Sequence, residues 1–214
     1  MDDQKARDAL MLAILPHVAF DGWSQSAIRA GAEDAGIEPA VAFNSFPGGP
    51  ADLMAHFSAW ADRRMLEMLE KQDLESMRVS ERVAAGVRTR LELLAPHREA
   101  LRRGLAFLAL PQQAPLGLKC LYRTVDAIWY AAGDTATDYN FYSKRMLLAG
   151  VYSSTLLYWL NDKSEGFADS WAFLDRRIAE VLKIGGRIGK SMKGLMDLPE
   201  RLLRSRPRAG FSQR

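Results

Sequence analysis

The sequence has one cysteine, no start that resembles a targeting signal, and no apolar run long enough to cross a bilayer. The single thiol, Cys120, excludes a disulfide framework and fits a reducing compartment, and we expect it to be a small core residue. The chain opens with MDDQKARDALMLAIL, acidic and poor in arginine, so we expect neither a signal peptide nor a transit sequence. The longest uncharged stretch, residues 146–161, is shorter than the roughly 18 to 20 residues of a transmembrane helix and predicts a buried core helix instead.

Sequence signatures of catalysis are also missing. His17, His56 and His97 lie far apart, and none has a Glu or His partner at metal-ligand spacing. No serine lies in a nucleophile elbow, and Cys120 has no signature of a nucleophile. We therefore expect no enzyme activity, no metal site and no cofactor.

Helical periodicity and helix-ending residues fill most of the chain. Apolar residues recur at spacings of three and four, and glycines and prolines separate the segments, which predicts an all-α fold of about ten helices without strands. The expected helices cover residues 5–20, 24–35, a short segment from 39, 51–73, 80–95, 97–110, 116–132, 139–160, 167–182 and an amphipathic segment beyond 183.

The stretch DGWSQSAIRAGAEDAGIEPAVAFNSF, residues 21–46, has the spacing of a helix-turn-helix, with Gly36 at the break and Pro39 in the first turn of the second helix. It resembles the DNA-binding end of TetR-type regulators. DNA contact, however, requires basic side chains, and this stretch has only Arg29 against four acidic residues. We expect a degenerate motif over residues 1–49 that binds no nucleic acid. The alternative is a ligand-responsive TetR-type transcriptional regulator.

Positive charge is concentrated at the C-terminal end. Residues 183–214 contain nine Lys and Arg and two acidic residues, a net of +7, so residues 1–182 carry −4 of the overall +3. On a helical wheel the apolar and basic residues of this segment separate, which predicts a tail lying on an anionic membrane. The alternative is a helix docked on its own domain. The apolar side consists of Ile184, Ile188, Met192, Leu195 and Met196, and the basic side of Lys183, Arg187, Lys190 and Lys193.

The central segment, residues 50–182, is apolar and rich in aromatic residues. The uncharged run 104–118 contains two prolines, and we expect it to leave apolar space between helices where a lipid tail fits. Three aromatic residues within one helical turn near residue 140 point in different directions, so we expect at least one of them to be exposed at an interface. The candidate cavity residues are Leu105, Leu108, Leu110, Leu118, Tyr122 and Tyr152.

The stretch WYAAGDTATDYNFYSKRMLLAGVYSSTLLYW, residues 129–159, resembles the central signature of the ninth Coq protein family, lipid-binding accessory proteins of ubiquinone biosynthesis. RLELLAPHREALRRGLAFLALPQQAP, residues 90–115, and SWAFLDRRIAEV, residues 170–181, match the same family. The resemblance implies a TetR-like all-α fold, a homodimer, a cavity for an isoprenoid lipid within residues 50–182, and a C-terminal helix that binds membrane. It also implies a non-catalytic role, in which a ubiquinone precursor is presented to the di-iron demethoxyubiquinone hydroxylase.

The resemblance further implies a partner-binding patch. Phe141 stands there where the family commonly has a tryptophan. Eukaryotic members are mitochondrial matrix proteins, whereas this chain starts at its first expected helix, so we expect a bacterial cytoplasmic protein that is peripheral on the inner membrane. Bacteria also use other hydroxylases, so the expected partner is the demethoxyubiquinone hydroxylase or an equivalent enzyme. The patch positions are Trp129, Asp134, Asp138, Phe141, Tyr142 and Arg145.

Overall fold

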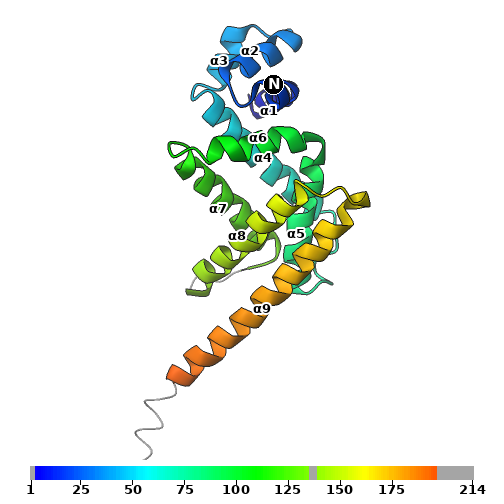
Figure 1. Ribbon diagram of the computed structural model, residues 1–214, viewed down its shortest axis with the longest axis vertical. Coiled ribbons are helices and arrows are strands. Elements are labelled where there is room, and N and C mark those ends of the chain that lie inside the picture. Colours follow the sequence, from blue (N-terminus) through cyan, green and yellow to red (C-terminus); the bar gives the residue numbers. More distant parts are fainter. Residues whose placement is uncertain (1–2, 135–138, 197–214) are drawn as a thin grey trace, which may run out of the picture.

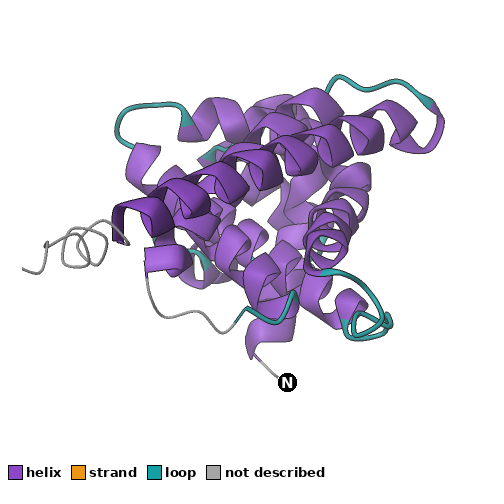
Figure 2. Ribbon diagram, turned by 90° about the horizontal axis from the view of Figure 1, so that it is seen from below, coloured by secondary structure: helices purple, strands orange, loops and turns teal. Residues whose placement is uncertain are grey.

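The computed structural model describes residues 3–134 and 139–196, with the backbone alone for 139–140 and 184–196. Every regular element in these residues is a helix (Figure 1, Figure 2), so the predicted all-α class is confirmed. Nine α-helices and two 3-10 turns lie in the described part of the chain. The α-helices are α1 (Asp3–Asp21), α2 (Gln25–Asp34), α3 (Pro39–Ser45), α4 (Pro50–Leu69), α5 (Val79–Leu94), α6 (Arg98–Leu108), α7 (Ala114–Ala131), α8 (Tyr139–Trp159) and α9 (Ala168–Met196).

Helices α2 and α3 form the predicted helix-turn-helix at one end of the molecule, and α1 packs against α2 (Figure 1). Ser24 caps α2, because its Oγ accepts the backbone N–H of Ala27 at 3.2 Å. Gly36 has a φ of 66° in the turn, a left-handed conformation that glycine adopts at little cost. A Cβ atom at Gly31 would lie 2.6 Å from the Cα of Ile14, so α2 approaches α1 closely only because residue 31 is glycine. The spacing that predicted the motif therefore corresponds to a tightly packed unit.

Helix α4 connects this unit to the other helices. It packs against α1 and also against α5 and α7. Its buried face includes Phe57 and Trp60, whose rings stack with centroids 6.1 Å apart. Helix α8 packs against α7 and α9. One side of α4 faces a space between α5, α6, α7 and α8, and this space contains the candidate functional site.

Helix α9 is longer than predicted. We expected a helix ending at residue 182, followed by a separate amphipathic segment. The helix instead runs from Ala168 to Met196 without a break, and its end projects away from the other helices (Figure 1). Each glycine inside a helix costs only about 1 kcal/mol, and extending an existing helix is much easier than starting one. The boundary expected at residue 183 therefore falls inside a continuous helix.

Candidate functional site

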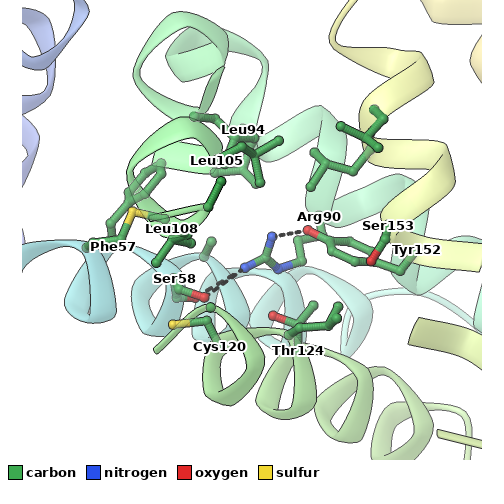
Figure 3. A pocket seen from close by; sticks show the side chains of 18 residues that line it. Phe57, Ser58, Arg90, Leu94, Leu105, Leu108, Cys120, Thr124, Tyr152 and Ser153 are labelled. Atoms are coloured by element: carbon green, nitrogen blue, oxygen red, sulfur yellow. Dashed lines mark hydrogen bonds between the residues drawn. The ribbon is translucent and has the colours of Figure 1, made fainter. Parts of the chain in front are cut away.

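A cavity of about 300 Å³ lies between α4, α5, α6, α7 and α8 (Figure 3). Most of its wall is apolar, and Leu157 and Ala109, both exposed, mark its opening. The buried side chains of Phe57 and Leu94 form part of its wall. A concave, mostly apolar wall with a few polar groups is typical of a small-molecule site. The other lining residues are Met54, Ser58, Ala61, Arg90, Leu101, Leu105, Leu108, Gly117, Cys120, Leu121, Thr124, Tyr152, Ser153 and Leu156.

Three of the six residues predicted for a lipid cavity, Leu105, Leu108 and Tyr152, line this space. The other three, Leu110, Leu118 and Tyr122, lie outside it and are exposed. Leu118 and Tyr122 lie outside the cavity because of the way α7 is rotated about its own axis. Its residues 117, 120, 121 and 124 face the cavity, so positions 118 and 122 point to the opposite side, where Leu118 is 69% exposed.

Polar side chains, among them Ser58, Arg90 and Tyr152, gather on one part of the cavity wall (Figure 3). The buried Arg90 donates from Nε to Asp62 Oδ1 at 2.8 Å, from Nη1 to the hydroxyl of Tyr152, and over longer distances to Ser58. Thr124 donates to the same Asp62 oxygen at 2.8 Å. Burial raises the pKa of the Tyr152 hydroxyl, so it is neutral at physiological pH. This cluster was missed in the sequence, because residues 58, 62, 90, 124 and 152 come from four different helices.

The five described positions of those assigned to partner binding do not form one exposed patch. Arg145 is 6% exposed and donates to Asp126 at 2.7 Å and to Asp134 at 3.2 Å. The Asp134 side chain also accepts a hydrogen bond from Lys144 at 2.7 Å. Phe141 is half-buried, with the guanidinium carbon of Arg145 3.3 Å from its ring centroid. Arg145 is therefore an internal ion-pair residue that holds α8 against the end of α7.

Of the remaining patch positions, Tyr142 is 65% exposed, in agreement with the expectation that one aromatic residue of this turn faces solvent. Trp129 is half-buried and donates from its indole N–H to the carbonyl of Lys144 at 3.2 Å. Asp138 lies outside the described residues. Tyr142 is also part of an apolar surface between α7 and α8, which we call the α7–α8 groove. Its members are Leu118, Leu121, Tyr122, Val125, Tyr142, Arg145, Met146 and Ala149.

A second, larger groove of about 780 Å³ lies between α5, α7, α8 and α9, and we call it the α9 groove. Trp129, Asp134 and Lys144 lie on its wall, and the rest of the lining is mainly aliphatic. Sequence reasoning missed it, because four helices that are distant in sequence enclose it. The aliphatic lining comprises Val79, Val83, Leu147, Leu148, Val151, Ile178, Val181 and Leu182.

The predicted membrane-binding positions lie at the end of α9. Lys183 is exposed, and the other eight fall in residues 184–196, of which the backbone alone is described. Among the described helices, none combines the length and apolar character needed to span a bilayer. In the same residues no three His, Cys, Asp or Glu side chains are grouped as metal ligands would be.

The surface of the helix-turn-helix is acidic. Glu33, Asp34 and Glu38 are exposed around the turn, and only Arg29 supplies positive charge between residues 21 and 46. Asp34 pairs with His17 of α1 at 2.8 Å, which does not reverse the sign of the surface. The geometry of a DNA-binding motif is therefore present without the positive potential that attracts a phosphate backbone.

Comparison with known proteins gives consistent results. The family model described as COQ9 matches residues 114–185. The rat protein named ubiquinone biosynthesis protein COQ9, mitochondrial, is 34% identical over 86% of this chain and 61% of its own length. The human protein of that name is 32% identical over 86% of this chain and 59% of its own length, and the Drosophila melanogaster protein is 35% identical over 83% and 56%. The chain thus spans about three fifths of the length of these curated relatives.

Among solved structures, the TetR transcriptional regulator from Nitrosomonas europaea superposes with a TM-score of 0.68 at 21% sequence identity. The match covers 82% of this chain and 97% of the regulator. At this level of identity the match shows the fold alone, and it confirms the predicted TetR-like architecture.

Proposed function

Because this chain belongs to the COQ9 family of ubiquinone biosynthesis proteins, we propose that it is a non-catalytic accessory protein of that pathway. In this proposal it binds an isoprenoid quinone precursor, associates with a membrane surface, and presents the lipid to a partner hydroxylase. The partner is the demethoxyubiquinone hydroxylase or an equivalent enzyme, and the working unit is a homodimer. The named relatives are mitochondrial, which favours the inner membrane as the site of action.

The observation that carries the proposal is the apolar cavity between α4 and α8 (Figure 3). A polyprenyl chain exposes a large apolar area, and transfer from water stabilises it by roughly 25 cal/mol for each Å² that is buried. Free diffusion of such a molecule to a soluble active site would be correspondingly slow. A protein that supplies an apolar site next to the bilayer lowers this barrier. The larger α9 groove is a separate aliphatic surface that could also take a polyprenyl chain.

Membrane association is supported by the amphipathic sequence at the end of α9. The helical continuity of residues 168–196 supports it further, because the segment leaves the body as a helix instead of requiring one to form on the membrane. Partner binding is supported by the exposed aromatic and aliphatic side chains of the α7–α8 groove, since exposed apolar patches mark interaction sites.

A second candidate function is favoured by one observation, the preserved helix-turn-helix geometry, which fits a ligand-responsive transcriptional regulator. The acidic surface of that motif argues against a regulator, because DNA binding requires basic side chains that neutralise the phosphate charges. A gel-shift experiment separates the two. DNA binding that weakens steeply with salt and persists after deletion of residues 183–214 would favour the regulator.

The test of the main proposal is organic extraction of the purified protein, followed by mass spectrometry. We expect a co-purifying quinone or polyprenyl species. An empty extract from protein that still binds liposomes would reject lipid carriage and leave a membrane-docked scaffold.

A further inference from the structure

The two segments that border the opening of the cavity lack acidic residues. Residues 100–125, which cover most of α6 and the first part of α7, contain no Asp or Glu. Residues 146–161, which follow along α8, carry no charge at all. About one residue in eight of the whole chain is acidic, and residues 1–182 have a net charge of −4. This region therefore differs in sign from the rest of the helical body. Its charged residues are Arg102, Arg103, Lys119 and Arg123.

Large apolar side chains are exposed around the same opening. Leu157 of α8 lines the cavity and is 57% exposed. Leu110 follows the lining residue Ala109 and is 43% exposed. Leu118 follows the lining residue Gly117 and is 69% exposed. Exposed apolar side chains that gather in one place mark an interaction site, and these three come from different segments of the chain.

Unpaired positive charge accompanies these leucines. Lys119 and Arg123 of α7 are exposed, and neither forms an ion pair with any described residue. Arg102 and Arg103 of α6 are also exposed, but both share the carboxylate of Glu99, at 3.3 and 3.8 Å. Two cations are thus left at this face without a protein partner. We call the following residues the mouth surface: Leu110, Leu118, Leu157, Lys119 and Arg123.

We infer that the mouth surface contacts an anionic phospholipid bilayer, so that the cavity opens directly onto the membrane. Such a bilayer offers anionic head groups to Lys119 and Arg123 and an apolar layer to the leucines, and surfaces that are both basic and apolar bind to it. An isoprenoid chain then passes between the bilayer and the cavity without crossing water, where its apolar surface is unfavourable. The inference rests on the membrane association proposed above and adds a second contact to that of the tail.

The mouth surface and the tail are placed so that one bilayer can meet both. In Figure 1 the turn between α6 and α7 and the projecting end of α9 lie toward the same side of the molecule. Two cations and three leucines form a weak site by themselves. Such a contact adds to the overall affinity when it is linked to a second site on the same chain. The tail therefore anchors the protein, and the mouth surface orients its cavity toward the lipid.

The first test reports whether the mouth surface enters the bilayer. The environment-sensitive fluorophore NBD is attached to Leu110→Cys or to Leu118→Cys, each in the full chain with Cys120→Ala, which leaves a single thiol. With phosphatidylcholine vesicles that contain phosphatidylglycerol, we expect the NBD emission to shift to the blue and to be quenched by doxyl-labelled lipid. Phe20→Cys is the matched control, because Phe20 is 83% exposed near the end of α1 and should show neither effect.

The second test measures the contribution of charge. Lys119→Gln with Arg123→Gln should weaken binding to the same vesicles about twentyfold, because each basic residue near an anionic surface contributes a factor of about five. Lys5→Gln with Arg29→Gln is the control pair. It removes the same charge from exposed positions of α1 and α2 and should change the affinity by about twofold or less, since distant charges are screened.

The outcomes separate the inference from the proposed function. If the wild type sediments with vesicles while labels at positions 110 and 118 neither shift nor are quenched, the inference is wrong and the tail is the whole membrane contact. Equal losses from the two charge pairs reject it as well. A shift that appears without vesicles and rises with protein concentration assigns the mouth surface to a second copy and also overturns the inference. A wild type that does not sediment at all overturns the proposed membrane association together with the inference.

Discussion

The burial of Arg145 leads to a prediction about what its replacement would do. Its guanidinium donates to Asp126, to Asp134 and to the carbonyl of Phe141, and it covers the Phe141 ring. The Asp134 side chain is only 4% exposed, so an Arg145→Ala substitution removes one cation from a buried carboxylate that Lys144 still pairs with at 2.7 Å. Breaking a buried pair from one side costs about 3 to 5 kcal/mol. Because Lys144 remains, we expect about 3 kcal/mol, the lower end.

Urea denaturation followed by circular dichroism measures this cost. A loss of about 3 kcal/mol corresponds to a shift of the midpoint by roughly 1 M or more. Two matched variants provide the scale. Lys144→Ala removes a partly exposed partner of the same carboxylate and should cost about 1 kcal/mol or less, whereas Tyr142→Ala truncates an exposed side chain and should change stability by about 0.5 kcal/mol or less.

The same three variants test how the α7–α8 groove works. If partner binding uses exposed residues, Tyr142→Ala weakens the complex without affecting stability, and Arg145→Ala weakens it only through unfolding. An Arg145→Ala protein that is as stable as the wild type, yet loses the partner, would refute the internal role of this residue.

Three further predictions concern other parts of the chain. Burial opposes the charged form of Asp162, but hydrogen bonds from Ser164 and Ser170 lower its pKa to about 2. Asp162→Asn should therefore lower the free energy of unfolding by roughly 2 kcal/mol at pH 7. In urea titrations this deficit should disappear as the pH falls from about 4 toward 2. Gly31→Ala should destabilise by about 2 kcal/mol, measured by thermal unfolding, because its Cβ would overlap α1. Replacing Leu195 and Met196 with Glu should abolish liposome co-sedimentation while the circular dichroism spectrum is unchanged.

Each of these has a clear contradicting result. A pH-independent difference between wild type and the Asp162→Asn protein would show that the depressed pKa does not contribute to stability. For the glycine, Gly150→Ala is the control, because nothing lies within 4 Å of its added Cβ and alanine favours a helix. It should stabilise the protein by up to about 1 kcal/mol, and a loss equal to that of Gly31→Ala would contradict the packing argument. An undiminished liposome signal from the double Glu variant would remove the tail from the proposal.

The helical class, the helix-turn-helix and most helix positions could be predicted from the sequence, because they depend on local properties. Apolar spacing, capping by Ser24 and the turn at Gly36 act within a few residues of each other. The acidic sign of the motif is likewise a property of composition. The family resemblance, carried by residues 129–159, could also be found from the sequence alone and is confirmed by the comparisons.

Other features depend on contacts between distant segments, and only the tertiary structure decided them. The rotation of α7 places Leu118 and Tyr122 on the surface, although their neighbours two or three positions away line the cavity. Helical periodicity identifies an apolar stripe but does not say which neighbour it faces. The continuity of α9 through residue 196 was missed for a related reason. The cost of each glycine was judged locally, whereas extending a helix that is already formed is much easier than starting a new one.

For the polar groups of the cavity, too, the sequence determined one part and the tertiary structure the other. The sequence by itself determined that the chain contains an arginine, an aspartate and a tyrosine at positions 90, 62 and 152, with the charges they carry in water. The packing of α4, α5 and α8 decided that these three meet, that all three are buried, and that two of their charges cancel. Burial changes the cost of a charge by several kcal/mol, and burial is a property of the assembled helices rather than of any one of them.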